Sequence, residues 1–184
     1  SNASISTLTT ASGGTTSAIS ISTADSAKQV ATKINTAANA IGINAIATNA
    51  ATLSGVAATG TISFTLSGTA SVSLSASVTN SNDLTSLAAA INGASNTTGI
   101  SASFANPDVK SSIQLTSKDG SDIKIANYVH SATANTTFGE GPADLAGGAG
   151  ASTTLTNTNH TSVKSGIVTL SSTKGAITTA SGNT

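Results

Sequence analysis

The stretch from residue 60 to residue 129 alternates apolar and polar side chains in several short runs. A period of two is typical of half-buried strands, and the short Gly68-Thr-Ala turn between the first two runs favours a hairpin. The triplet Asn106-Pro-Asp and the Lys118-Asp-Gly turn separate the later runs. The runs that we expect to form strands are 61–67, 71–79, 99–104, 111–117 and 122–126.

Between the second and third of these runs, the period of the apolar residues changes to that of a helix. We expect Asn82 to cap this helix, Asp83 to lie in its first turn, and Gly93 to end it in a left-handed conformation. One helix face then packs on one sheet face. The expected buried stripe is Leu84, Leu87, Ala88 and Ile91.

The N-terminal part of the chain shows a similar order of elements. Runs around 5–8 and 18–22 predict two strands, and a helix follows that Asp25 caps and Gly42 ends. Alternation resumes at 43–48, and residues 49–55 are expected to connect directly to the next hairpin. The expected buried stripe of this helix is Ala27, Val30, Ala31, Ile34, Ala38 and Ile41.

The two parts align at a fixed offset of 57 residues. Ile34-Asn35 then falls on Ile91-Asn92, and Gly42-Ile43 falls on Gly99-Ile100. This agreement indicates an internal repeat. The first copy, however, lacks its two closing strands in sequence order.

The missing strands are predicted at the far end of the chain. Residues 166–178 have the same pattern as residues 112–124, with Leu170 on Leu115 and Gly175 on Gly120. The intervening glycine-rich residues 130–162 show no periodicity and are expected to form a loop.

The sequence therefore predicts an α+β fold of two small β-rich modules, each a mostly antiparallel sheet covered by one helix. We expect residues 59–129 to form one module, inserted into a discontinuous module of residues 4–57 and 130–181. Without the closing strands, the first sheet would expose an unpaired edge.

Composition narrows the possible functions. The 184 residues include 7 lysines, no arginine and 7 acidic residues, and the formal charge is zero, so the chain lacks the basic surface that nucleic acids or anionic membranes attract. No cysteine is present, which excludes disulfides and thiolate metal sites. About a third of the residues are Ser or Thr, and their alternation with aliphatic residues indicates strands with polar outer faces.

Several segments together resemble the variable middle region of bacterial flagellins, which carries an Ile-Asn motif. The order and spacing of the segments carry the resemblance, which covers nearly the whole chain. The segments are 50–55, 60–66, 86–92, 98–103, 113–125 and 165–175.

The resemblance implies a structural, surface-exposed outer region of a flagellin subunit, located extracellularly on the filament, with roles in motility and as an antigen. Its partners would be other flagellin subunits, which bind through long helical flanks that this sequence lacks. The motif also occurs in hook-associated and filament-cap proteins, so a domain of such a protein is an alternative. A surface adhesin module is another, and it would expose an apolar or aromatic patch.

The residue types that could carry chemistry are few, and we expect no catalytic, cofactor or metal site. The histidines His130 and His160 are expected to be exposed in loops, where their joint replacement by Ala would leave folding unchanged. Asp119 and Asp122 lie in a predicted hairpin turn and lack the further acidic ligands of a calcium loop. No Gly-x-Ser-x-Gly elbow is present, and no P-loop Lys follows the loop glycines. These glycines are Gly139, Gly141, Gly147, Gly148 and Gly150.

The polar strands generate a first prediction. The isolated chain should be monomeric and should not form filaments, because its sequence offers no long apolar seam for self-association. Light scattering over a range of protein concentrations measures this. A molecular mass that grows with concentration would contradict the prediction.

Overall fold

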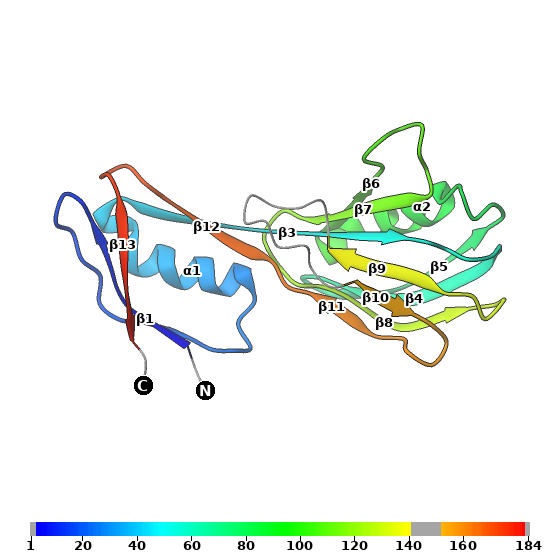
Figure 1. The fold of residues 1–184 in the computed structure, drawn as a ribbon, viewed down its shortest axis with the longest axis horizontal. Helices are drawn as coiled ribbons and strands as arrows, with labels where there is room; N and C mark the ends of the chain where they lie inside the picture. The colour runs from blue at the N-terminus through cyan, green and yellow to red at the C-terminus, as the bar shows by residue number, and fades with distance from the viewer. Residues whose placement is uncertain (1–2, 141–151, 183–184) are drawn as a thin grey trace.

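The structure is a computed structural model that describes residues 3–140 and 152–182. Figure 1 shows two lobes that follow one another along the long axis of the molecule, joined by the long strand β3 and by the segment that runs from β11 into β12. The helices are α1 (Ala27–Ala38), the 3-10 helix η1 (Asn39–Ile41), α2 (Thr85–Gly93) and α3 (Ser95–Thr98). The strands are β1 (Ala3–Thr10), β2 (Ile19–Ile21), β3 (Ile43–Ser54), β4 (Gly60–Ser67), β5 (Ser71–Val78), β6 (Ile100–Ser103), β7 (Ser112–Ser117), β8 (Ile123–His130), β9 (Thr136–Glu140), β10 (Thr153–Leu155), β11 (Ser162–Lys164), β12 (Ile167–Ser172) and β13 (Ile177–Gly182).

The first lobe contains β1, β2, α1, β12, β13 and the first half of β3. Its strands form a sheet in the order β13-β1-β2 and an antiparallel ribbon of β3 and β12. Helix α1 contacts β2, β3 and β12, so it bridges the sheet and the ribbon. The core is aliphatic, with Leu8, Ile34 and Ile43 nearly or fully buried at its centre.

The second lobe contains the larger core and two sheets. One sheet has the order β11-β8-β4-β5, and the other has the order β10-β9-β3-β7-β6. Helix α2 contacts β5 and β6, and so it too bridges two sheets. The α+β, mostly β fold is therefore confirmed, but each helix joins two sheets where one covered sheet was predicted.

Strand β3 belongs to both lobes. Its inward-facing side chains are buried along its whole length, but Ile43, Ala45 and Ala47 lie in the core of the first lobe whereas Ala51 and Leu53 lie in that of the second. The prediction that residues 49–55 form a connection was wrong, because strand alternation continues unbroken to Ser54.

The two lobes repeat the same strand pairings. In the ribbon of the first lobe Ala45 faces Leu170, and in the second lobe Ala102 faces Leu115, as the sequence repeat predicts. The order β13-β1-β2 corresponds to β8-β4-β5. Strands β12 and β13 thus pair with β3 and β1, which is the pairing that we expected of residues 166–178.

The helix ends differ in detail from the sequence prediction. Ser26, not Asp25, caps α1: its hydroxyl accepts from the Gln29 N–H, and the Gln29 side chain accepts from the Ser26 N–H. Asp25 does not cap the helix; its Oδ2 accepts a hydrogen bond from the Ser22 N–H at 2.7 Å and forms an ion pair with Lys33 Nζ at 2.5 Å. The helical segment ends at Gly42, as predicted, with a φ of 80°.

Helix α2 begins and ends beyond the residues that we expected. Asn82 does not cap it; Asp83 Oδ1 accepts from the Thr85 N–H and hydroxyl instead. Gly93 is the last residue of α2 and not a left-handed stop, because the chain continues into α3 and reverses at Gly99, with a φ of 72°. The predicted core residues Leu87 and Ile91 are both fully buried.

The predicted loop 130–162 contains strands β9 and β10, and β11 begins at its last residue; its residues 141–151 lie outside the described part. Phe138 and Leu155 are fully buried in the second core, although the predicted boundary assigned residues 130–181 to the first module. Strand β9 pairs with β3, β10 pairs with β9, and β11 pairs with β8. These long-range pairings form strands in a segment whose sequence shows no periodicity. The nesting of two independently folding modules stays a prediction, and the burial of Phe138 and Leu155 in the second core moves its boundaries from residues 59 and 129 to near residues 49 and 165.

An excision tests this nesting. Replacing residues 49–166 by an Asn-Gly turn joins Thr48 to Ile167, which face each other across β3 and β12, and should leave a folded first lobe. Residues 49–165 alone should also fold, and should be more stable than residues 59–129, which lack β9, β10, β11 and the β3 segment. Circular dichroism during urea denaturation measures the folding of the shortened chain and the stabilities of the two excised fragments.

The shortened first lobe carrying Ile34→Asp is the control that should fail to fold, because it buries a charge. Non-cooperative unfolding of the shortened chain without that substitution would contradict the nesting.

Candidate functional site

The Ile-Asn pair occurs once in each lobe, near the end of the helix. Ile34 and Ile91 are 2% and 0% exposed, so each anchors its helix in the core of its own lobe. The following residues, Asn35 in α1 and Asn92 in α2, point away from the core and are partly or fully exposed.

Each asparagine makes the same pair of hydrogen bonds to a strand residue ten positions further on. Asn35 Oδ1 accepts from the Ala45 N–H at 2.7 Å, and Asn35 Nδ2 donates to the Ala45 carbonyl at 2.8 Å. Asn92 Oδ1 accepts from the Ala102 N–H at 2.8 Å, and Asn92 Nδ2 donates to the Ala102 carbonyl at 2.9 Å. The hydrogen-bond donors and acceptors of the two lobes are therefore related by the same offset of 57 residues.

This geometry explains why the motif combines these two residue types. A side-chain amide has a donor and an acceptor, so it can pair with one strand residue in the way that a neighbouring strand would. An isoleucine one position earlier points to the core and fixes the helix at the distance that the amide requires. The motif is thus a helix-to-strand clip.

The acidic residues of the β7–β8 turn are used within the protein. Asp119 Oδ1 accepts from the Ser117 hydroxyl and the Ser121 N–H, both at 2.9 Å, and Oδ2 pairs with Lys28 Nζ at 2.7 Å. Burial of this carboxyl opposes its ionisation, but hydrogen bonds from Lys28, Ser121 and Ser117 outweigh burial and hold its pKa well below the usual range.

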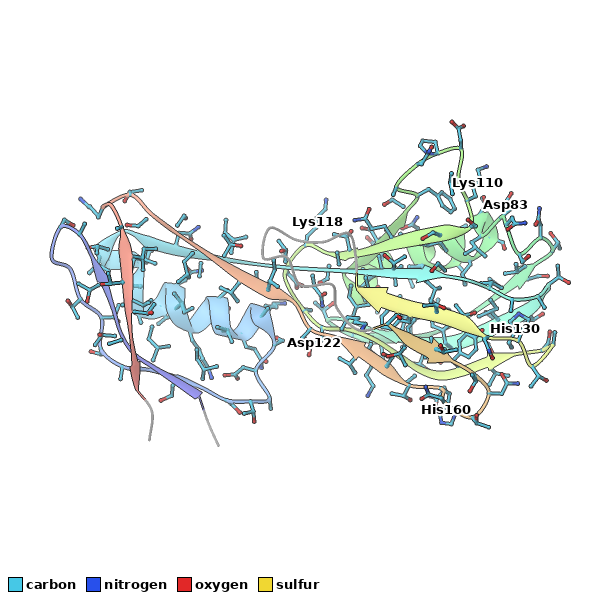
Figure 2. The ribbon with its side chains drawn as sticks, in the orientation of Figure 1. Asp83, Lys110, Lys118, Asp122, His130 and His160 are labelled. Atoms are coloured by element: carbon cyan, nitrogen blue, oxygen red, sulfur yellow. The ribbon has the colours of Figure 1, made fainter. Side chains whose placement is uncertain are left out.

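Asp122, which Figure 2 labels, lies between the two lobes. Its Oδ1 is buried and has no hydrogen-bond partner among the described residues, and burial raises the pKa of its carboxyl against a hydrogen bond from Ser165. No group of three or more His, Cys, Asp or Glu residues within 3–140 and 152–182 could hold a metal ion.

The two histidines lie in different environments. His160 is exposed, as expected, but His130 is fully buried at the end of β8, so its prediction as an exposed loop residue was wrong. Its Nδ1 accepts from the Ala132 N–H at 3.1 Å, which leaves the proton on Nε2 to be donated to the Ala58 carbonyl at 3.2 Å. Both ring nitrogens therefore hold loops in place.

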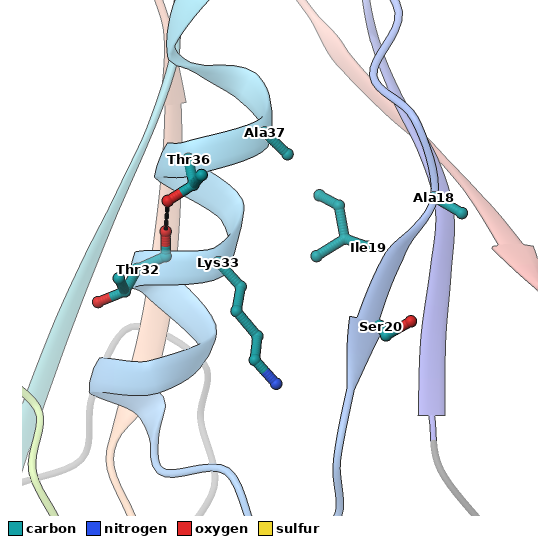
Figure 3. A pocket seen from close by; sticks show the side chains of 7 residues that line it. All are labelled: Ala18, Ile19, Ser20, Thr32, Lys33, Thr36 and Ala37. Atoms are coloured by element: carbon teal, nitrogen blue, oxygen red, sulfur yellow. Dashed lines mark hydrogen bonds between the residues drawn. The ribbon is translucent and has the colours of Figure 1, made fainter.

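An open groove of about 440 Å³ lies between α1 and β2 in the first lobe (Figure 3). Lys33 is the only ionisable residue in its lining, and its ammonium group pairs with Asp25. Thr32 and Thr36 hydroxyls both donate to carbonyls of their own helix, so neither is aimed at a ligand.

The glycine-rich segment contributes little to a described site. Gly139 lies in β9, whereas Gly141, Gly147, Gly148 and Gly150 lie outside the described residues. None of the described helices is long and apolar enough to cross a lipid bilayer.

A comparison with known protein families finds a match over the residues that form the second clip, Asn92 and Ala102. Residues 61–119 match the family model described as the flagellin hook IN motif. The match includes Ile91 and Asn92 and covers about a third of the chain. It confirms the resemblance to the flagellin variable region and supports a flagellar structural protein. A comparison with curated proteins finds no match.

The flagellin hook IN motif covers only one of the two clips. Asn35 and Ala45 lie outside the matched residues, yet they repeat the geometry of Asn92 and Ala102. The first lobe therefore has the same hydrogen-bonded unit outside the matched residues.

Sequence reasoning missed Asn49, which occupies an inward-facing position of β3 and is 4% exposed. Its Nδ2 donates to the Ser121 carbonyl at 3.1 Å and to the Lys164 carbonyl at 2.7 Å. A polar residue at an apolar position of the 43–54 alternation is the signal that could have identified it.

The clip predicts a specific loss of stability. Asn92→Ala should lower the free energy of unfolding by about 1–2 kcal/mol, because it removes two hydrogen bonds worth about 0.5–1.5 kcal/mol each. It should also speed amide exchange at Ala102. The control is Asn96→Ala, at an exposed residue of α3. Equal stability of the two variants in urea denaturation would show that the clip is unimportant.

Burial of His130 changes the expectation for the histidines. His130→Ala should destabilise the protein by about 2–4 kcal/mol, because it leaves a cavity and unpaired backbone groups. His160→Ala should change stability by less than about 0.5 kcal/mol, since this residue is exposed. Thermal denaturation of each variant measures the difference, and a His130→Ala variant as stable as the native protein would refute the buried placement.

Proposed function

We propose that this chain is the surface-exposed outer region of a flagellin subunit, displayed extracellularly on the flagellar filament, where it serves a structural role. The observation that carries the proposal is the duplicated helix-to-strand clip, of which one copy is the flagellin hook IN motif. The motif supports a flagellar structural protein, and the second copy extends the same architecture over both lobes.

The outer faces of the strands suit display in water. Along β5, Ser71, Ser73, Ser75 and Ser77 are all exposed, and together they make one polar face of the second lobe. The formal charge is zero, so charge repulsion between neighbouring copies contributes little to solubility. The hydration of the serine hydroxyl groups keeps this surface soluble instead. Polar, chemically tolerant faces of this kind favour a variable, antigenic surface.

The arrangement of β1 and β13 supports attachment to a larger subunit. Ser4 pairs with Gly182 across these antiparallel strands, so the chain enters and leaves the first lobe at one place (Figure 1). A region that projects from a stalk of two chain segments needs its entry and exit side by side. The second lobe would then be the more distant from the filament axis.

A non-catalytic role fits the use of the polar groups. Asp119 and the ring nitrogens of His130 are engaged in contacts within the protein. The Tyr128 hydroxyl is likewise buried against the Thr136 hydroxyl at 2.6 Å, and burial raises its pKa. These groups stabilise loops and strand ends, so we assign the chain no reaction.

Immunogold electron microscopy tests the proposed location. Antibodies raised against the purified chain should label intact cells of the source bacterium along the whole length of the flagellar filaments. Antibody adsorbed beforehand with the purified chain is the control, and it should leave the filaments unlabelled.

The other outcomes distinguish the alternatives. Label confined to the filament tip would indicate a cap protein, and label confined to the filament base would indicate a hook-associated protein. Label spread over the cell body would indicate an adhesin. Each of these patterns would overturn the proposal.

A further inference from the structure

Two strands connect the lobes, and such a connection alone would allow bending. Strand β3 crosses from one core to the other without a break, while the return path runs from β11 through Ser165 and Gly166 into β12. The crossing point lies at Asn49, where the inward-facing positions change from the first core to the second. The contacts at this point decide whether the lobes move independently.

The Asn49 amide ties three segments together at the crossing. Its Nδ2 donates to the carbonyl of Ser121 in the β7–β8 turn and to the carbonyl of Lys164 at the end of β11. The side chain is 4% exposed, so water competes little for these hydrogen bonds. Because Asn49, Ser121 and Lys164 all lie within residues 49–165, these two hydrogen bonds fix the β7–β8 turn and the end of β11 against β3, and so position the turn for its contact with the first lobe.

The β7–β8 turn of the second lobe also docks on the first turn of α1 in the first lobe. The Lys28 N–H donates to the Gly120 carbonyl at 3.2 Å, and Lys28 Nζ pairs with Asp119 Oδ2 at 2.7 Å. These contacts lie on the helix and not on the two connecting strands. They therefore resist a change in the angle between the lobes.

Close packing leaves no room at this contact. A Cβ atom on Gly120 would lie 2.3 Å from the Cβ atom of Ala47, and a Cβ atom on Gly166 would lie 2.5 Å from the Thr48 carbonyl oxygen. Gly120 also has a φ of 73°, which favours glycine. Both positions therefore require glycine for the lobes to approach this closely.

The negative charge of the β7–β8 turn is not repeated in the corresponding turn of the first lobe, which makes no contact of this kind among the described residues. Lys174 in the first lobe occupies the position that corresponds to Asp119, and it is exposed. Both turns reverse at a left-handed glycine, Gly175 or Gly120, so the backbone geometry is shared while the docking contacts are not.

We propose that Asn49, the 118–121 turn, Lys28 and Gly166 form a rigid joint that holds the two lobes at one fixed angle. The joint makes the chain a single stiff arm and not two tethered lobes. This property is independent of the proposed location on a filament, because it follows from contacts within the chain.

Distance measurement by double electron–electron resonance tests the joint. The chain has no cysteine, so Thr36→Cys in α1 and Ser75→Cys in β5 provide one exposed spin-label site in each lobe. The doubly labelled full chain should give one narrow distance distribution. A broad or multiple distribution in this protein would overturn the proposal without any further variant.

Two further variants identify the contacts that hold the angle. Asn49→Ala should broaden the distribution, whereas Asn44→Ala, at an exposed position of the same strand, should not. Lys28→Gln should also broaden it, whereas Lys33→Gln, which removes an ion pair within the first lobe, should not.

Circular dichroism must show that each variant is folded. If Asn49→Ala does not fold, the comparison of Lys28→Gln with Lys33→Gln decides the outcome. Unchanged distributions in every folded joint variant would show that these contacts do not set the angle.

Discussion

The fold depends on burial of a single strand by two cores. Strand β3 alternates without interruption over twelve residues, and its inward face supplies Ala45 to one core and Leu53 to the other. A period-two pattern cannot change register within a strand without turning apolar side chains to water. The two cores must therefore lie on the same side of β3, and this constraint places the lobes end to end.

The Ile-Asn clip explains how one unit could be used twice with so little sequence in common. Its requirements are local: a buried isoleucine, an asparagine beside it, and a strand residue ten positions later. In the first lobe the closing strands come from the far end of the chain, and the pairing of Ala45 with Leu170 still reproduces that of Ala102 with Leu115. The two lobes therefore share the same hydrogen-bond geometry, although their strands are connected in a different order along the chain.

Regular patterns allowed most of the fold to be predicted from the sequence. The repeat identified the partners of β12, and helical periodicity identified Leu87 and Ile91 as core residues. Local periodicity could not predict contacts between segments that are distant in the sequence. Phe138 is buried by strands that are separated from it in sequence, and the cost of burying His130 is offset by hydrogen bonds that its ring nitrogens make with Ala58 and Ala132.

Contacts with neighbouring side chains and distant segments also decide the helix ends and the environment of Asn49. A cap is decided by which side chain reaches the free N–H groups, so Ser26 displaced its equally suitable neighbour Asp25, which pairs with Lys33. Asn49 was overlooked because its two acceptors, on Ser121 and Lys164, are carbonyls from segments far away in the sequence. The clip of Asn92 was visible only as a motif, since spacing alone does not show which amide meets which strand.

A nuclear Overhauser spectrum of the isotope-labelled chain tests the shared strand most directly. If β3 is shared, cross-strand contacts join residues 43–48 to residues 167–172 and, in the same spectrum, residues 49–54 to residues 112–117. The Asn49 side-chain amide protons should also show contacts to residues near Ser121 and Lys164. Contacts from only one half of β3, with the other half lacking strand partners, would contradict a shared β3.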